Sequence, residues 1–249
     1  MGRLGVAVLA AALVAATGAQ AAAAPRPLAE KCSGDTSGVT AQPFTSPATD
    51  GIELYGIEVG TGPVGVVLVH ESPADLCGWL PFIPSLTGAG LRVLAFDLRG
   101  FGDSAFGIGN AAQAYDRDLA AAVARVRADG AEKVFLVGGS YGGAVSLAYA
   151  PQLRVDGVIS LSGEAYLPRG KTNALASVPR LHVPLLIVGS RHDHYLPVKD
   201  ALALLRKAGS KDKRTAFYPG GWHGWDIVED APYTASARAL VLRWIQARS

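Results

Sequence analysis

A serine between glycines directly follows an apolar, β-branched run, and this arrangement restricts the fold more than any other feature of the 249-residue chain. The run is Lys133–Val137, and Gly138–Gly143 reads Gly-Gly-Ser-Tyr-Gly-Gly, with Ser140 at the centre of a Gly-x-Ser-x-Gly pattern. This pattern predicts a strand that passes through a tight turn into a helix, because larger side chains beside such a turn collide with backbone. Glycine-rich turns also occur without a catalytic role, so a serine nucleophile requires a base and an acid elsewhere in the chain.

An acid and a histidine follow at the ends of two further strand-like runs. Asp193 comes soon after the apolar run Val183–Gly189, and His223 comes after a run that ends at Tyr218. A serine hydroxyl becomes a strong nucleophile only when an imidazole removes its proton and a carboxylate orients that imidazole. We therefore interpret Ser140 as the nucleophile, Asp193 as the orienting carboxylate and His223 as the general base.

Two earlier segments complete a pattern that extends from Asp50 to the C-terminus. Val64–His70 is a buried-type strand that leads into a loop, and Leu91–Ser104 is a strand followed by Asp-x-Arg-Gly-x-Gly-x-Ser. Together with the chain order serine, aspartate, histidine, these segments resemble the α/β-hydrolase superfamily. The resemblance implies an α/β fold with a mostly parallel twisted sheet, helices on both faces and an antiparallel N-terminal strand pair.

Apolar periodicity places the remaining elements between these motifs. We expect the antiparallel pair at Val39–Phe44 and Ile52–Val59, helices at Ala111–Ala128, Ala144–Tyr149, Pro197–Ala208 and Ala231–Gln246, and strands at Val155–Ser162 and Arg214–Tyr218. Only about 20 residues separate Ser162 from Val183, where many members of the superfamily insert a helical cap. The sequence therefore predicts a minimal lid and an active site that is open or covered only by loops.

The resemblance also implies an oxyanion hole formed by the backbone N–H groups of Tyr141 and Ser72. Most members of the superfamily have His-Gly after the first of the quoted strands, but this chain has His70-Glu71. A carboxylate beside a developing oxyanion is unfavourable, so Glu71 must point away, be neutralised, or bind a cationic group of the substrate at the pocket mouth. We treat Glu71 as a candidate substrate-binding residue, with an outward side chain on a surface loop as the alternative.

Other polar residues near these motifs receive lesser roles. Glu164 is an alternative orienting acid, because some members of the superfamily have their carboxylate after this strand. His192 and His194 flank Asp193, but no pattern such as His-Glu-x-x-His occurs, so we expect no metal site. We expect His70 to be a structural histidine, and the proposed chemistry needs no cofactor.

The N-terminus has the pattern of a secretory signal peptide. Arg3 precedes an uncharged, alanine-rich stretch from Leu4 to Ala24 that ends in small residues typical of a cleavage site. We therefore expect a signal peptide over residues 1–24 and a single catalytic domain over residues 25–249, located in the periplasm or secreted, with no membrane span after cleavage. A retained anchor is the alternative.

The chain has two cysteines, Cys32 and Cys77, which form the one possible intrachain pair. In an exported protein a disulfide is the natural interpretation, and it would make residues 25–39 a tethered arm. Two free or buried thiols are the alternative.

Composition limits the function classes. The net charge of +2 leaves no basic surface of the kind that nucleic acids require, and the 49% apolar content suits one compact domain, expected to be a monomer. We interpret the chain as a secreted serine hydrolase that cleaves a small carboxylic ester through an acyl-enzyme. A serine peptidase or aminoacyl amide hydrolase acting on short peptides is the alternative, and a non-catalytic binding protein is a further one. The resemblance implies an aspartate nucleophile for the dehalogenases and epoxide hydrolases of the superfamily, so Ser140 argues against both of these activities.

Overall fold

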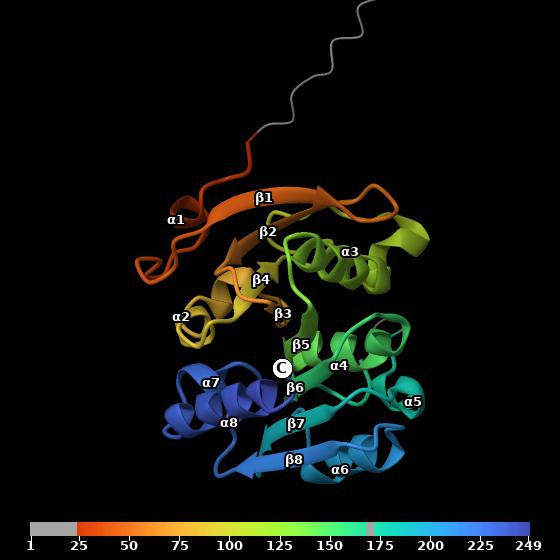
Figure 1. Ribbon diagram of the computed structural model, residues 1–249. Helices are drawn as coiled ribbons and strands as arrows, with labels where there is room; N and C mark the ends of the chain where they lie inside the picture. The colour runs from red at the N-terminus through yellow and green to blue at the C-terminus, as the bar shows by residue number, and fades with distance from the viewer. Residues whose placement is uncertain (1–23, 168–171) are drawn as a thin grey trace, which may run out of the picture.

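The computed structural model describes residues 24–167 and 172–249 (Figure 1). In these ranges eight strands form one sheet in the order β1-β2-β4-β3-β5-β6-β7-β8. The strands are β1 (Gln42–Pro47), β2 (Glu53–Val59), β3 (Val64–Val69), β4 (Arg92–Phe96), β5 (Lys133–Gly139), β6 (Gly157–Leu161), β7 (Leu185–Ser190) and β8 (Lys213–Tyr218). Strand β2 pairs antiparallel with β1 and β4, and all other pairs are parallel, which confirms the predicted fold class.

Helices cover both faces of the sheet, as Figure 1 shows. One face carries α3 (Tyr115–Ala128), α4 (Ser140–Tyr149), α5 (Ala174–Ser177) and α6 (Val198–Lys207), and the other carries α2 (Ile83–Thr87), α7 (Asp226–Glu229) and α8 (Thr234–Gln246). Short 3₁₀ segments lie at Leu76–Trp79, Gly109–Gln113, Ala150–Gln152 and Val178–Arg180, and α1 (Leu28–Lys31) belongs to the N-terminal arm.

The core consists of two apolar layers separated by the sheet. Alternate residues of β3 show the division, since Val67 and Val69 pack with the α3 and α4 side while Val66 and Leu68 pack with the α2 and α8 side. All four side chains are fully buried. A parallel strand that is covered by helices on both faces has no side chains in contact with solvent. Its sequence is therefore continuously apolar instead of alternating between polar and apolar residues.

Element boundaries differ from the sequence prediction where tertiary pairing decides them. Strand β1 begins at Gln42 and ends at Pro47 because its partner in register is Glu53–Glu58 of β2. Strand β1 tolerates two prolines because it lies at the edge of the sheet, where an N–H that faces solvent is not needed for a hydrogen bond to another strand. Helix α8 begins at Thr234 rather than Ala231, because Pro232 disfavours helical geometry in the residue before it.

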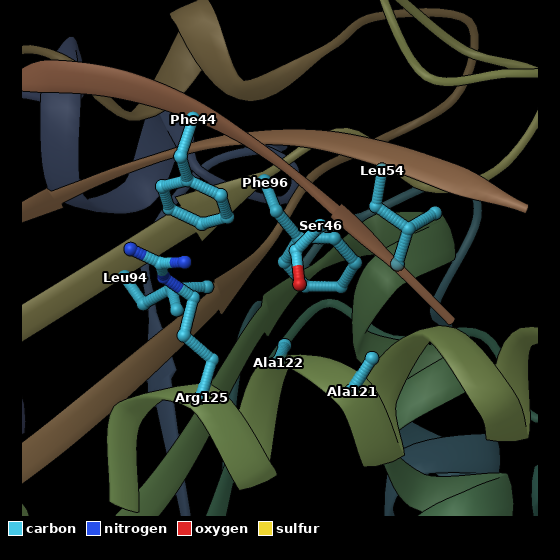
Figure 2. A pocket seen from close by; sticks show the side chains of 8 residues that line it. All are labelled: Phe44, Ser46, Leu54, Leu94, Phe96, Ala121, Ala122 and Arg125. Carbon is cyan, nitrogen blue, oxygen red and sulfur yellow. The ribbon is translucent and has the colours of Figure 1, made fainter. Parts of the chain in front are cut away.

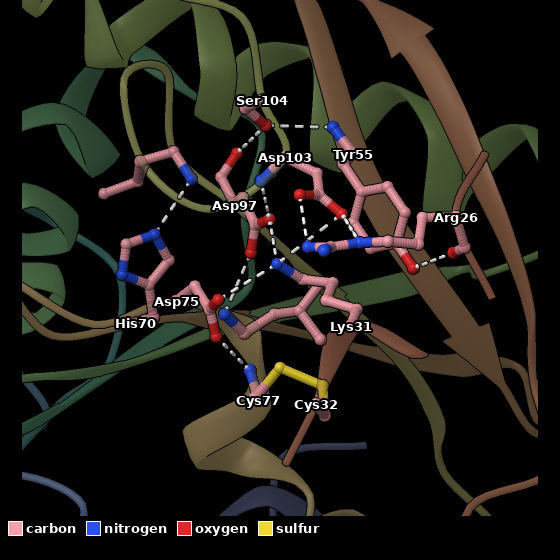
Figure 3. Close-up of polar contacts among 12 residues, drawn as sticks. Arg26, Lys31, Cys32, Tyr55, His70, Asp75, Cys77, Asp97, Asp103 and Ser104 are labelled. Atoms are coloured by element: carbon pink, nitrogen blue, oxygen red, sulfur yellow. Dashed lines mark hydrogen bonds and ion pairs between the residues drawn. A yellow bond between two sulfur atoms is a disulfide. The ribbon is translucent and has the colours of Figure 1, made fainter. Parts of the chain in front are cut away.

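The N-terminal arm is attached to the domain by a disulfide and a buried ion pair (Figure 3). Cys32 is bonded to Cys77. Beside it the fully buried ammonium of Lys31 lies 2.9 Å from a carboxylate oxygen of Asp97 and 3.0 Å from one of Asp75. The arm therefore contacts the loops that follow both β3 and β4.

Asp97 also organises the backbone around this ion pair. One of its oxygens accepts a hydrogen bond from the N–H of Leu76 (2.9 Å), and the other accepts one from the N–H of Asp103 (2.8 Å). Arg26 forms two hydrogen bonds to the side chain of Asp103, of 2.9 and 2.6 Å. A buried carboxylate is stable only when its charge and its acceptor sites are satisfied, and these contacts meet that requirement.

A small apolar pocket lies between α3 and the first strands of the sheet (Figure 2). The guanidinium carbon of Arg125 sits 3.5 Å from the centre of the Phe44 ring. The pocket is lined by Phe44, Ser46, Leu54, Leu94, Phe96, Ala121, Ala122 and Arg125. None of the candidate catalytic residues takes part in it.

Within the described ranges, no helix combines the length and the apolar character that a bilayer crossing requires. The predicted signal peptide lies outside the described residues except for Ala24.

We predict that replacing both cysteines by serine lowers the free energy of unfolding by about 4 kcal/mol, because the bond closes a loop between residues 45 positions apart. Urea unfolding without reductant measures this difference, and reduced wild-type protein is the matched control. Equal stability of the variant and the oxidised wild type would contradict the prediction.

Candidate active site

The three predicted catalytic residues lie at the carboxyl ends of parallel strands. Ser140 directly follows β5, Asp193 lies in the loop after β7, and His223 lies in the loop after β8. Parallel strands end at the same edge of a sheet, so residues far apart in the sequence meet there. The structure brings all three together.

The turn at Ser140 places this residue in the left-handed region, with a φ of 46°. The flanking glycines are required by close approach, since a Cβ on Gly142 would lie 2.1 Å from the carbonyl oxygen of Val69. A Cβ on Gly138 would lie 2.3 Å from the carbonyl oxygen of Gly142. The small residues of the sequence pattern therefore allow the helix to pack directly against neighbouring strand ends.

His223 bridges the serine and the acid. Its Nε2 lies 2.7 Å from Oγ of Ser140, and its Nδ1 lies 2.9 and 3.0 Å from the two carboxylate oxygens of Asp193. With a proton on Nδ1, the imidazole donates to Asp193 and presents an unprotonated Nε2 to the hydroxyl. This tautomer can accept a proton from Ser140.

The carboxylate of Asp193 is held by its own loop. Its Oδ1 accepts hydrogen bonds from the N–H groups of Tyr195 (2.9 Å) and Leu196 (3.1 Å). Burial alone would raise the pKa of Asp193, but the hydrogen bonds from His223 and from the N–H of Leu196, together with the charge of His223, outweigh it and lower the pKa. Asp193 is therefore ionised beside the imidazole.

The environment of His223 favours its protonated form. Burial alone would lower the pKa of His223, but the hydrogen bond and charge of Asp193, followed by the charges of Glu71 and Glu164, raise it. The ring of Tyr195 packs on the imidazole with 4.8 Å between ring centres. Several carboxylates thus favour a positive charge on this histidine.

Glu164 is the alternative orienting acid. Within the described residues it makes no hydrogen bond to His223, because Nδ1 of His223 is already bonded to Asp193. Burial raises the pKa of Glu164. The geometry favours Asp193 as the orienting acid.

The candidate oxyanion residues come from α4 and from the loop after β3. Tyr141 is the second residue of α4, so its N–H has no acceptor in the preceding turn of the helix and is free for a ligand. Ser72 is exposed in the loop after β3. Their role as oxyanion donors stays a prediction.

The side chain of Glu71 does not point outward into solvent, which was one of the two alternatives predicted from the sequence. It is partly buried, and its Oε1 accepts a hydrogen bond from the N–H of Trp225, 2.6 Å away. Burial raises its pKa to about 7. Contact with a cationic substrate stays a prediction, whereas the contact with the histidine loop was not anticipated.

Ser162 and His70 directly follow β6 and β3. The sequence predicted His70 as a structural histidine, whereas it did not single out Ser162. Ser162 is fully buried and has a φ of 53°, and its Oγ has no hydrogen-bond partner within the described residues. His70 is also fully buried, with Nδ1 2.7 Å from the carbonyl oxygen of Glu71 and Nε2 accepting from the N–H of Leu98 (2.9 Å). The only sequence signal for Ser162 was its position at the end of a strand, next to Gly163.

The comparisons with known proteins agree with this fold. The profile of the family described as alpha/beta hydrolase fold matches residues 66–178, and that of the family described as serine aminopeptidase, S33, matches residues 157–227. An esterase from Pyrococcus furiosus superposes with a TM-score of 0.73 at 15% identity, covering 84% of this chain and 93% of the other. The chain belongs to the α/β-hydrolase superfamily, as the resemblance predicted.

Curated relatives match shorter stretches. Epoxide hydrolase A of Mycobacterium tuberculosis is 34% identical over 139 residues, which are 55% of this chain and 39% of the relative. Bifunctional epoxide hydrolase 2 of Rattus norvegicus is 46% identical over 54 residues, which are 22% of this chain and 10% of the relative. The chain thus spans less than half the length of these relatives.

We predict that kcat/KM for an uncharged ester rises with pH through a histidine ionisation that lies above the ordinary value of about 6.5. His223 must be neutral to accept a proton, and the carboxylates around it raise its pKa, so activity is lost as the pH falls through that raised value. Initial rates from about pH 5 to 9 measure the profile. A rate constant independent of pH over this range would rule out His223 as the base.

Proposed function

We propose that this chain is an exported serine hydrolase that cleaves small carboxylic esters through an acyl-enzyme. The observation that carries the proposal is the position of His223, with Nε2 2.7 Å from the hydroxyl of Ser140 and Nδ1 2.9 Å from Asp193. These distances suit proton transfer between a nucleophile and an oriented base. The α/β-hydrolase fold and esterases among its structural neighbours support the same reaction class.

The reaction follows from this geometry. His223 removes the proton of Ser140 as its Oγ attacks the acyl carbon, and Asp193 stabilises the imidazolium that forms. The backbone N–H groups of Tyr141 and Ser72 would receive the oxyanion, and the imidazolium then protonates the leaving alcohol. Water, activated by the same imidazole, hydrolyses the acyl-enzyme and restores the serine.

The nucleophile favours esters over epoxides, although relatives are named epoxide hydrolases. Attack of a serine alkoxide on an epoxide carbon would form an ether, which the neutral imidazole and water cannot cleave. Attack on an acyl carbon forms an ester that water can hydrolyse. Ser140 therefore permits turnover only with acyl substrates.

Export is part of the proposal. The alanine-rich stretch over residues 1–24 is taken as a signal peptide, and residues 25–249 as one catalytic domain whose N-terminal arm is residues 25–39. The disulfide between Cys32 and Cys77 supports an oxidising compartment such as the periplasm or the exterior of the cell.

A second candidate, a serine peptidase or aminoacyl amide hydrolase, is favoured by the match of residues 157–227 to the serine aminopeptidase profile. The same three residues would perform amide hydrolysis, with His223 protonating an amine in place of an alcohol.

We predict that Ser140→Ala reduces ester hydrolysis by about 10³-fold or more, because the remaining groups cannot form a covalent acyl intermediate. Labelling by a fluorophosphonate probe should disappear together with turnover. Unchanged circular dichroism and thermal unfolding would show that the variant is folded. Residual probe labelling at the wild-type rate would place the nucleophile elsewhere.

We predict that purified residues 25–249 hydrolyse uncharged acyl esters with a larger kcat/KM than aminoacyl amides of similar size. A panel of matched p-nitrophenyl esters and p-nitroanilides measures both values in one assay. The Ser140→Ala variant gives the background for each substrate. Faster hydrolysis of the aminoacyl amides would contradict the prediction and favour the peptidase or amide hydrolase function over the esterase function.

A further inference from the structure

Glu71 is fixed at both its backbone and its side chain. Its carbonyl oxygen lies 2.7 Å from Nδ1 of His70 and accepts a hydrogen bond from the N–H of Ala74 (3.2 Å). Its carboxylate reaches across to the histidine loop, where Oε1 accepts from the N–H of Trp225 (2.6 Å). Glu71 thereby links the loop after β3 to the loop that carries His223.

Two glycines leave room for this carboxylate. A Cβ on Gly224, which follows His223, would lie 1.5 Å from Oε1 of Glu71. A Cβ on Gly139, which precedes Ser140, would lie 2.8 Å from the same atom. The Gly-x-Ser-x-Gly pattern leaves position 139 free, so the turn alone does not explain a glycine there. The carboxylate therefore lies between the nucleophile turn and the histidine loop.

The side chain of Trp225 is held separately from its backbone. Its ring meets the ring of Trp79 edge to face, with 5.6 Å between centres, and a Cβ on Gly78 would lie 2.1 Å from a ring carbon. Removing the carboxylate of Glu71 would leave this packing in place. The hydrogen bond is thus the contact by which residue 71 acts on the backbone beside His223.

Charge gives Glu71 a second route to the imidazole. The acids that interact with the charge of His223 are Asp193, Glu71, Glu164 and Asp226. Asp226 of α7 and Asp193 also act on Glu71. The charge of Glu71 raises the pKa of His223, and burial places the pKa of Glu71 itself at about 7. Burial also raises the pKa of nearby Glu229 to about 9, so Glu229 is neutral at pH 7.

We propose that Glu71 is a positioning residue for the reaction, which holds His223 in line with Ser140 through the N–H of Trp225 and favours the imidazolium that forms during attack. The inference rests on the proposed serine hydrolase function. It gives Glu71 a role between the catalytic loops rather than on an outward-facing surface.

Two substitutions separate the hydrogen bond from the charge. Glu71→Gln keeps an oxygen that can accept from Trp225 but removes the charge, whereas Glu71→Ala removes both. We expect Glu71→Gln to keep kcat within about threefold at alkaline pH and to move the acid limb of kcat/KM to lower pH by about half a pH unit. Glu71→Ala should move the limb in the same direction and also lower kcat by about tenfold or more.

Asp230→Asn is the matched control, because Asp230 is an exposed acid of the same segment. It should leave kcat and the limb unchanged. Thermal unfolding measures the folded fraction of each variant, so that loss of structure is separated from loss of positioning. An acid limb in Glu71→Gln that coincides with wild type, or equal kcat values for Glu71→Ala and Glu71→Gln, would overturn the inference.

A measurement independent of turnover separates this inference from the proposed function. NMR titration of the His223 imidazole in wild type and Glu71→Gln reports the charge effect, and the Trp225 amide resonance reports the hydrogen bond. If wild type hydrolyses no ester but the His223 pKa falls in Glu71→Gln, the proposed function fails and the coupling stands. If esters are hydrolysed and neither signal changes, the positioning role fails alone.

Discussion

The backbone of Ser140, held in the left-handed region at the junction of β5 and α4, is the constraint on which the rest of the site depends. A non-glycine residue in this conformation costs about 1–3 kcal/mol and persists only where its surroundings fix it. Here β5 is paired on both sides within the sheet, and Gly142 lets the helix approach the end of β3 without a clash. This backbone conformation places the hydroxyl of Ser140 within hydrogen-bond distance of His223.

The electrostatics of the site follow from burial among acids. Asp193, Glu71 and Glu164 all favour a positive charge on His223, and burial of the glutamates raises the pKa of each. In the proposed mechanism, a site arranged in this way would stabilise the imidazolium that forms when the serine proton moves to His223. The near-neutral net charge of the chain gives no indication of this local excess of acid.

The loop after β3 is held from two sides, by the N-terminal arm and by the loop that carries His223. The arm is bonded to this loop by the disulfide between Cys32 and Cys77. Lys31 of the arm also pairs with Asp97, which accepts a hydrogen bond from the N–H of Leu76 in the same loop. On the other side the carboxylate of Glu71 fixes the histidine loop. The segment that would supply an oxyanion donor is therefore ordered by contacts remote in sequence.

The sequence by itself determined the fold class, the strand that precedes Ser140 and the chain order of Ser140, Asp193 and His223, because these depend on local patterns of apolar and small residues. The start of β1 at Gln42 and the buried position of Lys31 depended on partners in β2 and on Asp97, which no local pattern specifies. The direction of the Glu71 side chain was likewise decided only by tertiary structure, because the space it fills exists only when the turn before Ser140 and the loop after His223 are brought together. A residue's neighbours along the chain fix its backbone preferences, but the burial and charge around its side chain come from segments that meet only on folding.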